Sequence, residues 1–437
     1  MFQATKIDQL ARKTGFLRRK SKLTPLSFID LMLYNASEEY RSLRKISAEA
    51  KSEHSLTISK QGLDSRFSKE SVAFSKCILE EALKEQVTGY VDLSSNQLFK
   101  RVLIKDSTRF DIHESLKEQF PGFGGDSSKA GVSLQFEYDL KNGKVSDLDL
   151  QSELDRDCKD ARLKKASISA GDLIIRDLGY YSIDVIKTIS QNGGYFISRL
   201  YQSAKVYLSP ETKEEIYFDK IYNQMKSQHI LSQELNVYTG KERFPMRLVI
   251  SLLPDDVYQK RVRKRKRLNK QQGFSTSQSY KARAHFNLFV CNISANDLSM
   301  DDICNLYKTR WQIELVFKTW KSLLNIHKTR KMKYERFVTT IYMNLVWIII
   351  HWKILIPLRN YLYFNKTRLV SLFKCIDTLA GLSRKIRQLL RESSHKGYKT
   401  IHQIFDLLSS NHWLEHRNNR QSFEEINHLL FCISSDY

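Results

Sequence analysis

The strongest constraint on the fold is a stretch of strand-type periodicity between residues 95 and 200. From residue 132 to 140 every second side chain is apolar, Asn142-Gly143 follows, and residues 145 to 150 return as a second strand. Asn-Gly is the dipeptide that best suits a two-residue turn between twisted strands. Because one face of such a hairpin is buried, the alternation also sets its register.

Further strands are predicted on either side of this hairpin. An apolar stretch from 98 to 104 precedes it, and residues 173 to 175 form the next strand. A helix from about 182 to 191 ends at Gly193-Gly194 and leads to a strand from 195 to 200. Three antiparallel strands followed by strand, helix and strand predict a mixed α/β fold, in the order expected of a ribonuclease-H-like core.

With 437 residues the chain is too long for one ordinary core, and its pattern predicts four regions. We expect an N-terminal helical region (1–90), a mixed α/β core in two segments (91–200 and 287–345), a β-rich basic insertion (201–286) and a C-terminal helical region (346–437).

The N-terminal region contains a short segment around Gly62 that gives way, at Ser68 or Ser71, to an amphipathic run. This pattern resembles a helix-turn-helix, whose second helix enters a major groove. Two packed helices with an incidental turn would leave the same pattern, so both interpretations stay open.

The predicted insertion has strand candidates at Glu215 to Phe218 and at Arg247 to Leu253. It also carries a strongly basic segment, whose central cations are Arg263, Lys264, Arg265, Lys266 and Arg267. Such a segment can track a DNA backbone. The alternative is a solvated, mobile loop.

A formal net charge of +23 is costly in self-repulsion unless a polyanion neutralises it, so we expect nucleic acid as the partner. General basicity from a biased genome is the alternative. The sequence has no GxxxxGK[ST] loop, which argues against a nucleotide cofactor. The N-terminus lacks a signal-peptide stretch, and the apolar run from 345 to 358 is too short to span a bilayer, so we expect a cytoplasmic protein without a membrane partner.

One predicted helix, from Ser299 to about Leu324, carries polar residues with the spacing Y-x2-R-x3-E-x6-K: Tyr307, Arg310, Glu314 and Lys321. At about 100° per residue, these side chains fall within roughly a 60° arc of one helix. Taken alone, the same helix could be an exposed surface on which Arg310 and Glu314 form an ordinary ion pair.

Two aspartates follow predicted strands upstream of this helix: Asp106 in LIKDST and Asp177 in LIIRDLGYY. Together with Glu314 they would form a cluster of like charges, which normally requires divalent cations. Oxygen ligands suit Mg²⁺ or Mn²⁺, and two such ions can bind the attacking and leaving oxygens of a phosphoryl displacement. We therefore expect Asp106, Asp177 and Glu314 to be the catalytic residues and the ligands of two metal ions.

The segments KDST, IRDLGYY and LYKTRWQIELVFK together resemble the bacterial DDE transposases of the insertion-sequence-four family, which are defined by a Tyr-Arg-Glu-Lys helix. The resemblance covers about residues 95 to 345. It implies a ribonuclease-H-like core with a β-rich insertion, and cut-and-paste transposition without ATP. It also implies double-stranded DNA partners (transposon ends and target), phosphate contacts from Tyr307, Arg310 and Lys321, and a homodimer in the synaptic complex.

The sequence departs from related enzymes at one step. Those enzymes commonly form a hairpin on the transposon end, with an aromatic residue of the insertion, often Trp, stacking where a base is flipped. All five tryptophans of this chain lie outside 201–286, which leaves Phe286 or Tyr280 for that role. Two other functions fit the same residues: a catalytically silent DNA-binding protein, such as a transposition inhibitor, and a general ribonuclease-H-like nuclease.

Overall fold

The computed structural model describes residues 4–37, 42–84, 98–142, 144–322, 326–327, 329–366, 368, 370–389 and 394–413. The chain divides into two compact units. Unit 1 comprises Met1–Asp92, Ser107–Asp155 and Gln312–Arg420, and unit 2 comprises Leu93–Asp106, Arg156–Trp311 and Gln421–Tyr437. The four predicted regions stay a prediction, because the two units combine segments from several of them.

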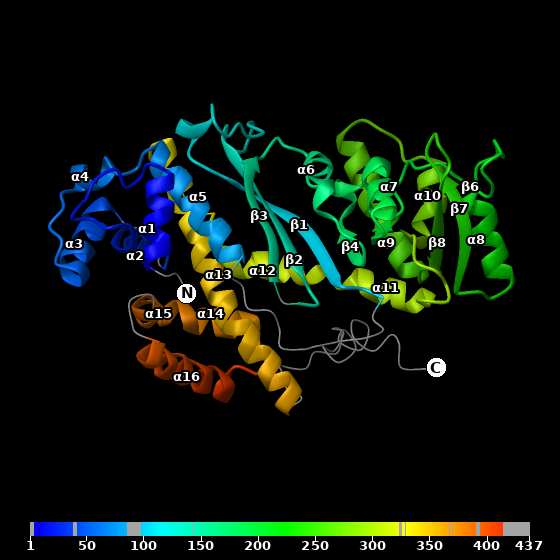
Figure 1. Cartoon of the computed structure of the whole chain (residues 1–437). Coiled ribbons are helices and arrows are strands. Elements are labelled where there is room, and N and C mark those ends of the chain that lie inside the picture. The colour runs from blue at the N-terminus through cyan, green and yellow to red at the C-terminus, as the bar shows by residue number, and fades with distance from the viewer. Residues whose placement is uncertain are drawn as a thin grey trace. The chain divides into compact units, whose positions relative to one another are not determined.

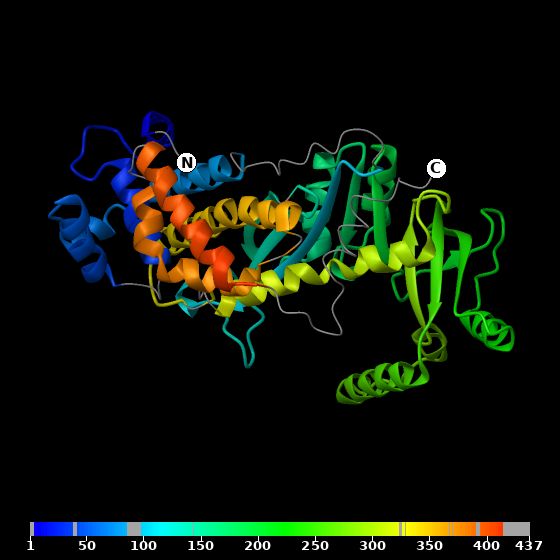
Figure 2. The same ribbon diagram turned by 90° about the horizontal axis from the view of Figure 1, so that it is seen from below.

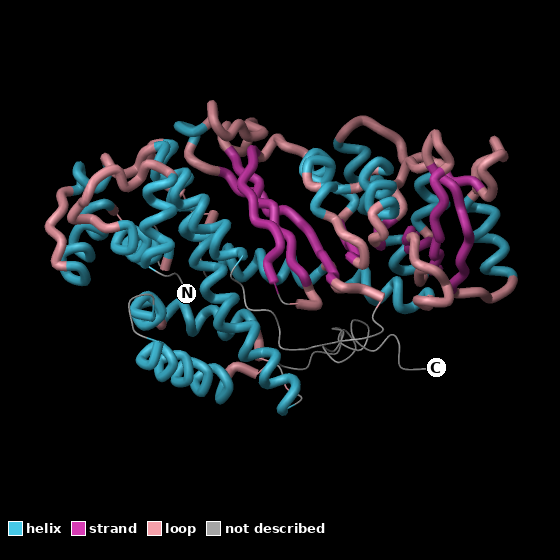
Figure 3. Tube along the Cα trace, viewed as in Figure 1, coloured by secondary structure: helices cyan, strands magenta, loops and turns pink. Residues whose placement is uncertain are grey.

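Unit 2 is built on strands that follow one another across a mixed sheet (Figures 1 and 3). In spatial order they are β1 (Arg101–Asp111, through Asp106), β4 (Asp172–Arg176), β5 (Tyr195–Arg199), β9 (Phe286–Cys291), β8 (Phe244–Leu252), β7 (Ser232–Thr239) and β6 (Val206–Tyr207). The β1-β4 and β4-β5 pairs are parallel, and the pairs from β5 onward are antiparallel. The unit is therefore mixed α/β, as predicted.

The helices of unit 2 are α6 (Asp157–Leu163), α7 (Ile183–Gln191), α8 (Phe218–Ser227), α9 (Asp255–Gln271), α10 (Gln278–Ala284) and α11 (Met300–Lys308). One apolar core joins Ile174 and Phe196 on β4 and β5 to Met225 on α8 and Leu248 on β8. Because these side chains share one core, strands and helices of the predicted insertion stabilise the sheet that carries Asp177.

Unit 1 contains the predicted hairpin. Its strands are β2 (Gly131–Asp139) and β3 (Lys144–Ser152), next to the second half of β1, in the order β3-β2-β1. The register pairs Val132 with Ser152 and Asp139 with Lys144, with one irregularity between Glu137 and Tyr138. The predicted hairpin is confirmed, although Gly143 of its turn lies outside the described residues.

The other elements of unit 1 are helices: α1 (Ala4–Lys13), α2 (Pro25–Ala36), α3 (Leu43–His54), α4 (Lys60–Asp64), α5 (Lys69–Lys84), α12 (Trp311–Ser322), α13 (Tyr334–Lys366), α14 (Leu372–Gly381), α15 (Ser383–Leu389) and α16 (Ser394–Asn411). Phe136 on β2 contacts Trp320 and Phe317 of α12, at ring-centroid distances of 4.7 and 5.9 Å. These contacts fix α12 to the strands of unit 1.

Helix α13 contains the apolar run noted in the sequence. By length and composition it could cross a membrane, but 83% of its most apolar window is buried inside the protein. Trp347 and His351 are 1% and 0% exposed. Most of this apolar stretch is therefore buried in the protein.

Helices α4 and α5 occupy the segment with the helix-turn-helix pattern. Gly62 lies inside α4, and α5 begins directly after Ser68. Phe74 and Ile78 of α5 are buried, and the Ser71 hydroxyl lies 3.0 Å from that of Thr339 on α13. This burial favours the interpretation of packed helices.

Two predictions about local structure are wrong. Glu215 to Phe218 is not a strand, because Phe218, Ile221 and Met225 recur at helical spacing and are buried along α8. The helix predicted from Ser299 to Leu324 is two helices, α11 and α12, separated by a turn at Thr309 and Arg310. The buried Thr309 hydroxyl donates a 2.6 Å hydrogen bond to the Leu306 carbonyl in that turn.

A buried ion pair next to Asp106 generates the first prediction. Lys105 Nζ on β1 lies 2.5 Å from Asp160 Oδ2 on α6, and both side chains are 0% exposed. Asp160→Ala leaves a buried cation without this partner, and should lower the free energy of unfolding by about 3–5 kcal/mol. Denaturant unfolding would measure the loss.

The matched control for this variant is Asp184→Ala. Asp184 pairs with Lys165 at 3.0 Å, but the two side chains are 62% and 36% exposed. An exposed pair is worth less than about 1 kcal/mol. Equal losses in the two variants would show that burial of the Lys105 charge is not what matters.

His351 generates a prediction about pH. Burial lowers its pKa to about 4, and its ring lies 2.8 Å from the Trp347 carbonyl. The unfolded chain takes up this proton near pH 6.5, so the stabilisation is complete above that pH and falls by up to about 3 kcal/mol toward pH 4. Urea unfolding between pH 7.5 and 4.5 should show a shallower pH dependence for His351→Leu than for the unmodified chain. An identical dependence would contradict the assignment.

Candidate active site

Asp106 and Asp177 lie side by side in unit 2. The parallel register of β1 and β4 pairs Lys105 with Arg176, so the next residue on each strand is one of the two aspartates. Successive side chains of a strand point to opposite faces. Lys105 and Arg176 are buried, whereas Asp106 and Asp177 are half-buried and face the other way. The register of the two strands therefore places Asp106 and Asp177 at neighbouring positions.

Arg310 neutralises one of them. Its Nη1 atom lies 3.1 Å from Asp106 Oδ2, and the two side chains are 16% and 19% exposed. Arg310 comes from the turn between α11 and α12, which explains why it can reach the end of the β1-β4 pair. In this structure the residue predicted to bind phosphate instead holds a carboxylate.

Tyr307 lies on α11 and is 5% exposed. Its ring is 5.0 Å from that of Phe289 and 5.6 Å from the Arg199 guanidinium carbon. Burial is the main cause that raises the pKa of Tyr307, and the negative charge of Asp177 adds to it. Tyr307 therefore presents a neutral hydroxyl, which can donate a hydrogen bond, within electrostatic reach of Asp177.

Arg199 is a member of this cluster that the sequence analysis missed. It is the last residue of β5, and the parallel register pairs Ile175 with Ile197. Continuing that register by two residues places Arg199 beside Asp177. Asp177 and Arg199 therefore lie at the carboxyl ends of β4 and β5, the edge where open α/β sheets bind ligands, and Asp106 lies level with them within β1. The available signal was a cation near the end of the strand predicted from 195 to 200.

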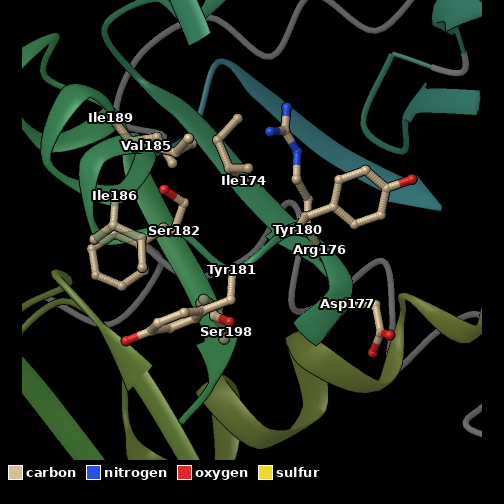
Figure 4. Close-up of a pocket in the computed structure, with 12 residues that line it drawn as sticks. Ile174, Arg176, Asp177, Tyr180, Tyr181, Ser182, Val185, Ile186, Ile189 and Ser198 are labelled. Carbon is tan, nitrogen blue, oxygen red and sulfur yellow. The ribbon is translucent and has the colours of Figure 1, made fainter. Parts of the chain in front are cut away.

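A small pocket lies next to Asp177 (Figure 4). Figure 4 shows Val185, Ile186 and Ile189 gathered together, with the Asp177 carboxylate directed away from them. The pocket has a volume of about 30 Å³, which suits a single water molecule. It cannot hold a nucleotide, so a substrate has to approach the aspartates from outside it.

Glu314 and Lys321 belong to unit 1, on α12. They are seven residues apart, or about 20° around the helix, and so share one face. Glu314 is exposed, whereas Lys321 is half-buried and donates a 3.1 Å hydrogen bond to the Arg109 carbonyl. Burial lowers the pKa of Lys321.

The predicted metal site is therefore present as two parts. Asp106 and Asp177 are adjacent in unit 2, and Glu314 belongs to unit 1. Within the described part of the chain, no three His, Cys, Asp or Glu side chains form a group that could hold a metal ion. Adjacent carboxylates on parallel strands are nevertheless suitable donors for a hard divalent cation. The convergence of Glu314 on them stays a prediction.

The basic segment of the predicted insertion is a helix, α9, and not a loop. Its five central cations, Arg263 to Arg267, are all exposed. The two aromatic residues predicted to stack on a flipped base are both covered. Phe286 is 2% exposed in the core, and the Arg265 guanidinium lies over the Tyr280 ring at 5.5 Å. The burial of Phe286 excludes it from stacking on a base.

Comparisons with known proteins match most of the chain. A family model described as "Transposase DDE domain" matches residues 97–350. The transposase for insertion sequence element IS231B of Bacillus thuringiensis subsp. berliner is 29% identical over 444 residues, covering 97% of this chain and 92% of that protein. The transposase for insertion sequence element IS1151 of Clostridium perfringens is 30% identical over 362 residues, covering 79% and 76%.

Among solved structures, the cryo-EM structure of the piggyBac transposase synaptic complex with hairpin DNA covers 96% of this chain and 85% of its own. The TM-score is 0.43 and the sequence identity 11%, so this likeness carries no argument about the fold.

The adjacent aspartates generate a prediction about metal binding. Asp106→Asn or Asp177→Asn should weaken Mn²⁺ binding by more than about tenfold, because each variant removes a charged oxygen ligand. Calorimetric titration of the full chain with Mn²⁺ would measure this. Asp184→Asn, an exposed aspartate on α7, is the control. Unchanged Mn²⁺ affinity in both site variants would rule out the aspartate pair as a metal site.

Proposed function

Since this chain belongs to the DDE transposase family, we propose that it binds the terminal inverted repeats of its transposon, cuts the donor DNA there and joins the ends to target DNA. The chain is a DNA transposase, and the proposal concerns how it works. The observation that carries it is the side-by-side placement of Asp106 and Asp177 on parallel strands. A general nuclease would not need the cationic helix and tyrosine that accompany them.

The proposed catalytic core is ribonuclease-H-like. Two observations support it: the order β3-β2-β1 in unit 1, and the parallel order β1-β4-β5 in unit 2. Strand β1 is common to both series. The proposed β-rich insertion contributes β6, β7 and β8, together with α8, α9 and α10.

Asp106, Asp177 and Glu314 would hold two Mg²⁺ or Mn²⁺ ions. When bound, such ions ionise a water or a DNA 3′-hydroxyl and stabilise the departing oxygen. This exchange of phosphodiester bonds requires no nucleotide cofactor. Glu314 is exposed on a helix that is fixed by Phe317 and Trp320, so its carboxylate is accessible to a ligand.

The cationic and phenolic side chains bind the DNA strand in this proposal. Arg310 releases Asp106 and binds a phosphate of the DNA instead. Asp106 can then bind a metal ion without competition from the arginine. Tyr307 donates its neutral hydroxyl, since burial raises its pKa. Lys321 holds the strand further along α12. A homodimer in the synaptic complex and a hairpin on the transposon end complete the proposed pathway.

The central test replaces one carboxylate. Glu314→Gln should reduce Mg²⁺-dependent cleavage of transposon ends by more than about 100-fold, because it removes a metal ligand. Binding of the ends should stay nearly intact, because no basic contact is lost. Gel assays of nicking and of binding on the same labelled DNA would measure the two effects.

Glu118→Gln is the matched control, because Glu118 is an exposed glutamate of the same unit. If Glu314→Gln nicks the ends at the wild-type rate, the proposed triad is wrong. A second assay asks whether the unmodified protein joins a pre-cut end to target DNA. Failure there, with binding intact, would instead identify a catalytically silent DNA-binding protein.

A further inference from the structure

Helix α9 is anchored to unit 2 along one seam. The Tyr258 ring stacks on that of His285 at 3.7 Å, and Val262 is 6% exposed. Asn269 is 7% exposed, and its side-chain amide donates a 3.1 Å hydrogen bond to the Ser275 carbonyl. These anchors recur every four and seven residues, so they lie on one face of the helix. The helix is therefore held in a definite orientation.

Three cations of α9 are engaged within the protein. Arg261 donates to the Phe286 carbonyl at 2.9 Å and to the Asn287 side chain at 2.7 Å. Lys260 pairs with Asp256 at 3.0 Å. Arg265, as noted above, lies over the Tyr280 ring. The contacts of Arg261 and Arg265 help to position the helix, and Asp256 balances the charge of Lys260.

The other five cations of α9 are exposed, and no ion pair joins them to an acidic side chain in the described ranges: Arg263, Lys264, Lys266, Arg267 and Lys270. Four of them (Arg263, Lys266, Arg267 and Lys270) have the spacing i, i+3, i+4, i+7, and form what we call the α9 stripe. The stripe spans about 10 Å at 1.5 Å per residue. Figure 2 shows α9 running away from the strands of its own unit, which leaves this face open.

We propose that the α9 stripe binds the phosphate backbone of duplex DNA, an inference that rests on the proposed function and extends it. Phosphates succeed one another about every 3.4 Å along the axis of each strand, so a stripe of about 10 Å spans about three such intervals and can contact about four phosphates, one for each cation. A cationic helix that is already held through other residues loses little freedom on binding. Backbone contacts of this kind position DNA without reading its sequence.

The chemistry of α9 favours DNA over a membrane surface. A helix that lies on a membrane buries a broad apolar face among the lipids. Tyr258 and Val262 of α9 pack against the rest of unit 2. Among the described residues of this helix, Leu268 is the one large apolar side chain that is exposed, at 41%. The exposed surface is otherwise polar and cationic.

The position of α9 also connects it with the candidate active site. Burial lowers the pKa of Arg261, and the positive charge of Arg199 lowers it further, which places the two guanidinium groups within electrostatic reach. Arg199 in turn lies beside Asp177 by strand register. Cations therefore extend from the base of α9 to the aspartate pair within unit 2. DNA bound by the stripe would follow this cationic surface toward the aspartates.

The experiment measures how the affinity for a 30-base-pair duplex depends on salt. The variant changes the four stripe residues to Gln together (R263Q, K266Q, R267Q and K270Q). The plot of log affinity against log salt has a negative slope, and its magnitude should fall by about 3.6, or 0.9 for each lost phosphate contact. Glutamine is a good helix former, so the melting temperature should not change. Fluorescence anisotropy at 50 to 300 mM KCl would give the slopes.

The control variant removes the same charge elsewhere in unit 2, at four exposed cations outside α9 (R162Q, K213Q, K220Q and K241Q together). For this control variant, the magnitude of the salt slope should fall by less than about 1. Equal slopes for the two variants would overturn the proposal, because they would show a general charge effect. Loss of binding to anionic lipid vesicles, or to single-stranded DNA alone, with the duplex slope unchanged would overturn it as well.

The outcome is separable from that of the proposed function. A stripe variant with an unchanged slope, alongside an unmodified protein that cleaves ends, would reject the stripe and leave the transposase chemistry standing. A lowered slope in a protein that neither cleaves nor joins ends would support the stripe and reject the chemistry.

Discussion

The parallel pairing of β1 with β4 is the constraint on which the rest of unit 2 depends. It places two carboxylates next to each other, which is electrostatically unfavourable without nearby positive charge. Arg310 supplies that charge to Asp106, and Arg199 lies beside Asp177. On the opposite face of the same strands, Lys105 is buried with Asp160. Nearby cations thus offset the repulsion between the two carboxylates.

The same constraint explains why Arg310 lies where it does. A continuous helix from Ser299 would have kept Arg310 in line with Tyr307. The turn at Thr309 instead ends α11 and directs Arg310 to Asp106. Arg310, which a phosphate would engage in the proposed function, therefore already neutralises Asp106. This exchange of partners is a physical reason for an arginine here, since its charge persists at any pH that the protein meets.

Much of the sheet could be predicted from the sequence, because its signals are local. The strand alternation, the Asn-Gly turn and the Gly193-Gly194 stop each depend on neighbouring residues, and the corresponding elements are present. The errors arose where packing decides. The local sequence predicts that Phe218 ends a strand from Glu215. Its burial with Ile221 and Met225 shows instead that it begins α8. For the basic segment, a mobile loop was one of two open alternatives, and the anchors on one face of α9 exclude it.

The sequence by itself determined which residues we propose for the chemistry: Asp106, Asp177 and Glu314, with Tyr307, Arg310 and Lys321. Spacing and residue type suffice for that, because ligand chemistry is a property of side chains. Only the tertiary structure decided which of them meet. It paired Asp106 with Asp177 and with Arg310, added Arg199, and separated the engaged cations of α9 from the exposed ones. Such contacts depend on strand register and on burial between segments far apart in the chain, which no local pattern records.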